Sequence, residues 1–238
     1  MRIAVTGEGP TDYGKRDYDT GKWIEGPLQK YAKKIAEKVL AEEVELCVLE
    51  KESVKNIRIQ RKSLKGLEGF SVPAKKFTYW MKEQGIRKGI YYCDADREGS
   101  EKNTPGNAEK RFRTVYNQIA IGLAETEAIP VVALHMIESW LLGDKKALEI
   151  AFRVSIPNHE MPSKPEYLWG EKTDPNSSYP KNYLKRLIAK SDKRYADFKG
   201  NQKDFCEIAE ASDLECMRKN CPISFEKFYM DFVNMICK

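Results

Sequence analysis

Residues 89–100 read GIYYCDADREGS, and this stretch decides the fold. Its first half is an apolar, aromatic run at residues 90–93 that is typical of a short buried strand. Asp94, Asp96 and Glu98 then place three acids at alternating positions where that strand should leave the core. Like charges crowded in this way repel one another unless a cation neutralises them, and carboxylate oxygens are the usual ligands of hard divalent cations. The stretch therefore predicts a buried strand that ends in a metal-binding turn.

Strand patterns alternate with amphipathic helix patterns over the first 152 residues. Strands are expected at residues 2–6, 44–50, 88–93 and 129–135. Apolar residues that recur every three to four positions predict helices at residues 24–41, 73–84, 107–125 and 136–152. This repeated alternation predicts an α/β fold in which helices cover both faces of a parallel sheet.

The character of the chain changes after Phe152. The next thirty or so residues are rich in proline, asparagine, serine and glycine, which predicts a long irregular loop. Helical periodicity resumes at residues 183–191, 204–211 and 225–236. We therefore expect residues 1–152 to form the catalytic domain and residues 153–238 to form an irregular loop and a helical cap packed on it.

Composition narrows the location and the chemistry of the protein. No stretch of the 238 residues approaches the roughly 20 consecutive apolar residues of a membrane span, and the first residues, MRIAVTGEGP, are not typical of a signal peptide. A cytoplasmic protein without a membrane partner is expected. The six cysteines lack the spacing of a zinc site or a disulfide scaffold. The two histidines leave little material for nucleophilic catalysis that depends on histidine.

Positive charge is concentrated between residues 51 and 65, KESVKNIRIQRKSLK, which carry six cations against the single acid Glu52. Clustered cations of this kind suit a phosphate backbone. The candidates for nucleic-acid binding are Arg58, Arg61, Lys62 and Lys65. A solvated surface loop is the alternative interpretation of the same charges.

The predicted topology brings further acids toward the aspartates. Open parallel sheets bind ligands beyond the carboxyl ends of their strands, near the switch in strand order. Glu8 follows the first strand as Asp94 and Asp96 follow the third, so the three face one crevice if these strands are neighbours. Glu138 follows the fourth strand and is a further candidate metal ligand, although an acid at a helix start also favours the helix dipole. Lys181 follows Pro180 and is a candidate cation for a transition-state phosphate, or else an exposed lysine of a helix start.

Two of these motifs together resemble the Toprim domain. EGPTD at residues 8–12 and DADREG at residues 94–99 match its glutamate in the first turn and its DxD in the third, although Ser100 replaces the final glutamate of the related topoisomerase signature. Three further motifs resemble small stand-alone Toprim-like proteins related to OLD-family nucleases, namely IESWLL at 137–142, YPKNYL at 179–184 and CPISFEKF at 221–228.

The resemblance implies a Toprim-like, Rossmann-like fold and metal-dependent phosphodiester chemistry. By position, Glu8 would be the general acid or base, and Asp94 and Asp96 would bind Mg²⁺ or Mn²⁺. Topoisomerases and primases of this class need further large domains, so the expected activity is hydrolysis of DNA or RNA by an endonuclease. Relatives often serve in antiphage defence beside an ABC-type or OLD-type ATPase, which is therefore the partner protein that the resemblance implies.

Two other functions fit the same residues. One is a Toprim-like module that binds nucleic acid or a partner without cutting. The intact acids argue against this function. The other is a metal-dependent phosphohydrolase that acts on a small nucleotide. The sequence lacks the GxxxxGK[ST] motif of a P-loop ATPase.

Overall fold

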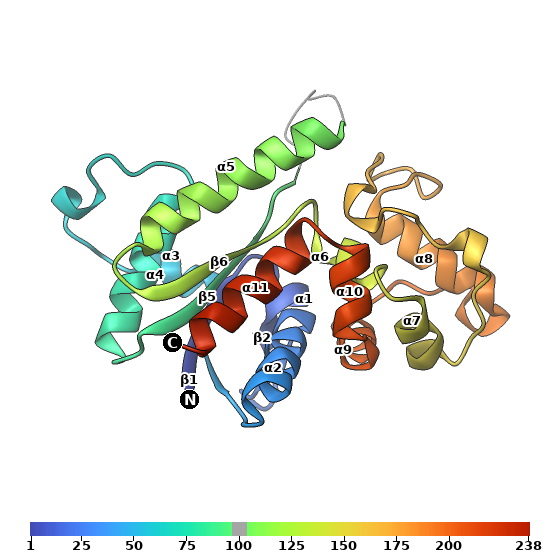
Figure 1. The fold of residues 1–238 in the computed structure, drawn as a ribbon, viewed down its shortest axis with the longest axis horizontal. Helices are drawn as coiled ribbons and strands as arrows, with labels where there is room; N and C mark the ends of the chain where they lie inside the picture. The colour runs from blue at the N-terminus through green and yellow to red at the C-terminus, as the bar shows by residue number, and fades with distance from the viewer. Residues whose placement is uncertain (97–103) are drawn as a thin grey trace.

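The computed structural model describes residues 1–96 and 104–238, and its centre is a parallel sheet (Figure 1). The predicted α/β fold with a parallel sheet is confirmed. The strands of this sheet run in the order β4-β1-β5-β6, with bounds β4 (Glu45–Val48), β1 (Arg2–Gly7), β5 (Lys88–Asp94) and β6 (Glu127–Ala133).

The register of β1 against β5 fixes where the acidic turns lie. The two strands pair in parallel from Ile3 opposite Lys88 to Gly7 opposite Tyr92. The ladder continues one step further, since the Glu8 amide donates to the Tyr92 carbonyl at 3.1 Å. Because β4 lies on the other side of β1, the strand order reverses between β1 and β5. Glu8 and the end of β5 therefore flank the switch point at which such sheets bind ligands.

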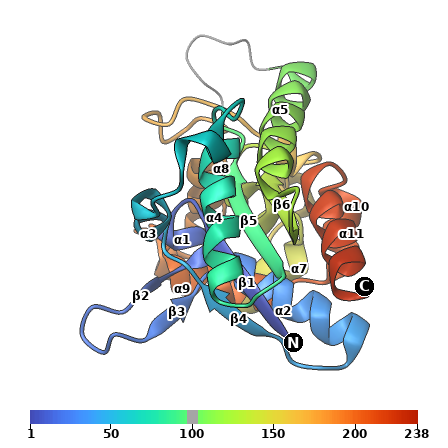
Figure 2. The same ribbon diagram turned by 90° about the vertical axis from the view of Figure 1, so that its left-hand side faces the viewer.

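Helices cover both faces of the sheet, and alternate strand residues face the two layers. Tyr92 packs in a core with α2 (Pro27–Leu40) and α11 (Ser224–Ile236). Tyr91 packs in a second core with α4 (Ser71–Glu83) and α5 (Pro105–Leu123). Figure 2 shows these layers on the two sides of the strands.

Two local departures from the predicted elements have physical causes. The helix expected from residue 24 begins at Pro27, because residues 23–25 pair instead with Gly14–Arg16 as β3 and β2 of a small hairpin. The helix expected at 136–152 is two helices, α6 (Ile137–Leu141) and α7 (Lys145–Phe152). The break arises because the Asp144 side chain accepts hydrogen bonds from the Lys146 and Ala147 amides and starts a new helix.

Short helices occupy segments that the sequence predicted as loops. The basic stretch contains α3 (Lys51–Asn56) and the 3₁₀ turn η1 (Arg61–Leu64), and the turn after β1 contains α1 (Pro10–Tyr13). The predicted irregular loop after Phe152 is confirmed apart from two 3₁₀ turns, η2 (Asn158–Glu160) and η3 (Pro165–Tyr167). The remaining elements are α8 (Pro180–Ser191), η4 (Lys193–Tyr195), α9 (Gln202–Ala211) and α10 (Leu214–Asn220).

The C-terminal helices share the core of the sheet. Trp140 of α6 is fully buried, stacks on Phe228 and meets Phe225 and Tyr31 edge-on. Its indole nitrogen donates to the Ser224 hydroxyl at 2.7 Å. The helices after residue 152 therefore complete the layer beneath the sheet, whereas the domain boundary at residue 152 stays a prediction.

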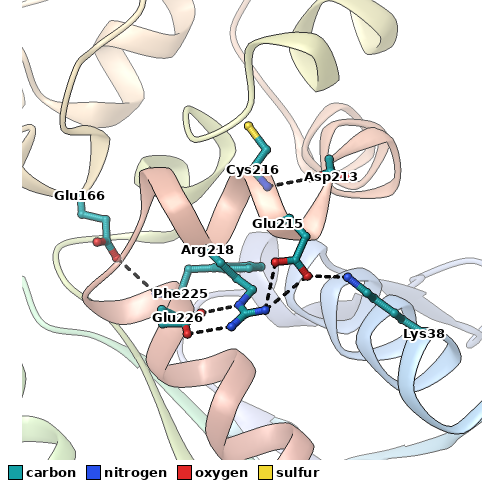
Figure 3. Close-up of polar contacts among 8 residues, drawn as sticks. All are labelled: Lys38, Glu166, Asp213, Glu215, Cys216, Arg218, Phe225 and Glu226. Carbon is teal, nitrogen blue, oxygen red and sulfur yellow. Dashed lines mark hydrogen bonds and ion pairs between the residues drawn. The ribbon is translucent and has the colours of Figure 1, made fainter.

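The buried carboxylate of Glu166 fastens the start of α11 (Figure 3). Its oxygens accept hydrogen bonds from the amides of Ile223, Ser224 and Phe225 at 2.8, 2.7 and 3.2 Å. These are amides of the first turn of a helix, which have no partner within the helix. The CPISFEKF motif is thus explained by structure, since Ser224 also bonds Glu166 and Trp140.

A charged network joins α10 and α11 to α2 on the same side (Figure 3). Arg218 donates to both carboxylate oxygens of Glu226, at 2.6 and 3.0 Å, and to Glu215 at 3.0 Å. Glu215 also pairs with Lys38 of α2 at 2.6 Å. The Arg218 guanidinium lies over the Tyr229 ring at 4.2 Å. The bidentate geometry orients α10 against α11.

Replacing Glu166 with alanine should lower the free energy of unfolding by at least about 2 kcal/mol, because the buried amides of α11 lose their acceptor. Urea unfolding followed by circular dichroism measures the change. The control is Glu207→Ala, which removes a half-exposed acid of α9 paired with Lys203 at 3.8 Å and should cost less than about 1 kcal/mol. Equal losses in the two variants would contradict the role of Glu166.

Candidate functional site

Acidic side chains from three separate segments meet at the carboxyl edge of the sheet. Glu8 follows β1 and Asp12 lies on α1. Asp94 ends β5, Asp96 lies two residues beyond it, and Glu138 lies in the first turn of α6. The structure therefore brings together the acids that the sequence predicted from Glu8, Asp94, Asp96 and Glu138, and it adds Asp12. Glu98 lies outside the described residues.

Gly9 allows the turn after β1 to present Asp12. Its φ of +76° lies in the left-handed region that favours glycine. A side chain at this position would place its first carbon 2.4 Å from the Asp12 carboxylate, which is closer than atoms approach. Pro10 then begins α1 at its first position, where proline is well accommodated. Gly9 and Pro10 of the EGPTD motif thus favour the backbone conformation that brings Asp12 beside the end of β5.

The acids are near enough to disturb one another's ionisation. Loss of hydration raises the pKa of Asp12 well above its usual range, and Glu138, Asp96 and Glu8 raise it further. Only 8% of Asp12 is exposed. Loss of hydration also raises the pKa of Asp94, followed by the charges of Asp12 and Asp96. Strongly perturbed acids grouped in this way are typical of functional sites.

Asp96 is exposed at the same edge and feels the acids on both sides of it. Loss of hydration, then Glu138 and Glu8, raise its pKa to about 6. Lys172 and Arg111 act in the opposite direction. Lys172 belongs to the loop before α8, so this loop reaches the site from the C-terminal part of the chain (Figure 2).

Lysines from two different elements neutralise part of the acidic charge. Lys51 of α3 pairs with Glu8 at 3.0 Å, and Lys181 of α8 pairs with Glu138 at 3.5 Å. Lys181, a candidate from the sequence, therefore lies beside an acid of this edge, and its side chain is 38% exposed. The hydroxyl of Tyr92 donates to Asp94.

The donor set fits a hard divalent cation, because carboxylate oxygens are the ligands that Mg²⁺ prefers. Within the described part of the chain, no three histidine, cysteine, aspartate or glutamate side chains lie close enough together to hold a metal ion. Metal binding by Glu8, Asp94, Asp96 and Glu138 stays a prediction.

The four predicted nucleic-acid contacts lie on the segment between β4 and α4, which also holds Lys51. Arg58, Arg61, Lys62 and Lys65 are all exposed. None of them pairs with an acid of residues 1–96 or 104–238. The segment between β4 and α4 lies toward the same end of the sheet as the loop before α8 (Figure 2).

Residues 24–231 match a family model described as a domain of unknown function, DUF4276. The chain belongs to this family. No curated protein and no solved structure matches the chain. The matched part of this DUF4276 protein includes Asp94, Asp96, Glu138 and Lys181 and begins after Glu8 and Asp12. No helix in the described ranges is long and apolar enough to cross a membrane.

Sequence reasoning did not assign Asp12, Lys51, Tyr92 and Lys172 to the site of this DUF4276 protein. Asp12 had a usable signal, since it closes the EGPTD motif that contains Glu8. Tyr92 also had one, because alternate residues of a strand share a face and Tyr92 is two positions before Asp94. Lys51 and Lys172 had no signal in the sequence, because tertiary structure alone brings their segments to the edge of the sheet.

The raised pKa of Asp96 predicts a pH-dependent effect of Asp96→Asn on the metal-free protein. The folded state holds the Asp96 proton up to about pH 6, whereas the unfolded chain releases it near 3.8, so this group costs stability as the pH rises between them. The variant should therefore gain free energy of unfolding relative to wild type at pH 7 but not at pH 4. Urea unfolding in EDTA measures both values. Asp19→Asn, at an exposed hairpin position, is the control. A variant that is less stable than wild type at pH 7 would contradict the raised pKa.

Proposed function

We propose that this protein is a nuclease that uses Mg²⁺ or Mn²⁺ at the carboxyl edge of its sheet to hydrolyse phosphodiester bonds of DNA or RNA. The observation that carries the proposal is the placement of acids from three separate segments at the switch point of the sheet, where burial and neighbouring acids raise the pKa values of Asp12, Asp94 and Asp96. Such an arrangement costs stability in the metal-free protein, and a bound divalent cation would offset the cost. The resemblance of EGPTD and DADREG to the Toprim motifs supports the same chemistry.

We assign each side chain of the site a role in the proposed hydrolysis according to its contacts. Asp94 and Asp96 would hold the metal, with Asp12 and Glu138 as further oxygen donors. When bound, the metal supplies positive charge for phosphate oxygens and makes water a better nucleophile. The Lys51 ammonium fixes Oε1 of Glu8, so that the partly exposed carboxylate is positioned to take a proton from the attacking water. Lys181, beside Glu138, is positioned to bind a phosphate oxygen of the substrate.

The setting of this activity comes from the resemblance alone. A cytoplasmic location, an ABC-type or OLD-type ATPase as partner and a role in antiphage defence stay predictions. The basic residues of the segment between β4 and α4 would bind the phosphates that flank the scissile bond.

The direct test is cleavage of supercoiled plasmid and of tRNA in Mg²⁺ or Mn²⁺, with EDTA as the control. Wild type should cut at least one substrate, and Asp94→Asn should slow cutting at least about 100-fold while it keeps the fold. Asp19→Asn should cut at the wild-type rate. Binding of nucleic acid without cleavage in either metal would contradict the proposal and favour the non-catalytic binding module.

The basic segment should contribute sequence-independent affinity. Replacing Arg58, Arg61 and Lys62 with alanine should weaken binding of all nucleic acids alike. It should also flatten the slope of log K against log salt by up to about 0.9 per lost duplex contact, or about 0.7 for single strands. Fluorescence anisotropy at several salt concentrations measures the slope.

The matched control removes three cations from the opposite, amino-terminal end of the sheet, at Arg2, Lys82 and Arg87. Both triple variants change the net charge equally, so the comparison separates local contacts from overall charge. If both variants flatten the slope equally, the segment between β4 and α4 is a solvated loop.

A further inference from the structure

A cavity of about 330 Å³ lies beside Glu8 on the side of the sheet covered by α3 and α4. Its wall is mainly apolar and includes Val54 of α3, Phe70 at the start of α4, Pro73 and Tyr91 of β5. Lys51 and Lys55 line it as well. The cavity is thus apolar inside, with two lysines and one carboxylate among the residues that surround it.

The polar ring of a tyrosine, Tyr91, lines this cavity. Tyr91 is 7% exposed, and its ring meets the Phe77 ring edge-on with 6.0 Å between the ring centroids. Loss of hydration raises the pKa of Tyr91, so the hydroxyl keeps its proton and remains a donor. A ligand with a hydrogen-bond acceptor would find this donor in the wall of the cavity.

The size and chemistry of the cavity select its ligand. Small-molecule sites occupy about 300–1,000 Å³, so this cavity is at the lower limit and holds one flat ring system rather than a length of chain. Phe70 and Tyr91 offer aromatic surface for stacking, and the Tyr91 hydroxyl offers a polar contact. Lys51 and Lys55 offer positive charge for phosphates attached to that ring system.

We infer that the cavity takes one unstacked nucleobase of a single-stranded nucleic acid next to the phosphate that lies at Glu8. The inference rests on the proposed function, because it is the acidic edge that defines where the scissile phosphate lies. A base inside a duplex is stacked and paired and does not reach such a cavity without leaving the helix. The protein therefore prefers single strands or unpaired positions, and the base adjoining the cut contributes affinity.

The test compares two fluorescent 12-mers in EDTA, oligothymidine and a fully abasic strand of equal charge. Wild type should bind oligothymidine at least about fivefold more tightly than the abasic strand, because base stacking on aromatic side chains adds affinity that phosphate contacts do not. Val54→Trp fills the cavity and should bring this ratio close to one, with abasic affinity within twofold of wild type. Phe70→Leu, at a half-buried position, should also lower the ratio and covers the case in which Val54→Trp does not fold.

The matched control is Val115→Trp, the same substitution at a half-buried position of α5 that packs on the same core. It should leave the ratio unchanged. A wild-type ratio near one, or no binding of either strand, would overturn the inference, as would a ratio that neither cavity variant changes.

Failure of this inference is distinct from failure of the proposed function. If the protein nicks plasmid in the presence of metal but binds oligothymidine and the abasic strand with equal affinity, the proposed nuclease activity stands and the base-binding cavity is refuted. If wild type prefers oligothymidine more than fivefold, Val54→Trp abolishes this preference and no metal supports cleavage, the protein binds a base but does not cut nucleic acid.

Discussion

Repulsion between carboxylates at one edge of the sheet is the constraint on which the rest of the site depends. The parallel register of β1 and β5 carries Glu8 and Asp94 to the same end, and the glycine turn after β1 brings Asp12 near enough to Asp94 to raise its pKa. Nothing in the packing of the sheet requires acids there, since the strands are buried by apolar contacts on both faces. Burial first, and the neighbouring acids after it, raise the pKa values of Asp12 and Asp94. The acids at this edge lower the stability of the folded protein, and such locally unfavourable groups are typical of functional sites.

The C-terminal helices hold this edge in place from beneath. Helix α6 carries Glu138, which faces Lys181, and two residues later Trp140, which packs under α11. Ser224 at the start of α11 bonds both Trp140 and Glu166. Because Trp140 lies on the same helix as Glu138, a displacement of α11 would also move the acidic edge. The same helices place the loop that contains Lys172. The site therefore depends on residues before and after the predicted domain boundary at residue 152, which lie in one core.

Local patterns predicted the sheet well, because each strand is a short apolar run bounded by turns and each acid of the site follows such a run. The patterns failed where tertiary contacts decide. The β2–β3 hairpin contains no alternating apolar signal, and the Asp144 cap that splits α6 from α7 interrupts an otherwise continuous helical period. Lys51 could be predicted as basic but not as the partner of Glu8, since only the fold brings α3 beside β1. The cavity beside Glu8 was equally beyond prediction, because its wall comes from four separate segments.

The central claim is that the acidic edge binds a divalent cation, and calorimetric titration of the metal-free protein with Mn²⁺ at pH 7.5 tests it most directly. Wild type should show saturable binding. Asp94→Asn should bind at least about tenfold more weakly, because one carboxylate ligand and its charge are lost. Asp19→Asn, which removes an equal charge from the hairpin, should bind as wild type does. Equal Mn²⁺ affinity in wild type and Asp94→Asn, or no saturable binding in wild type, would contradict the account.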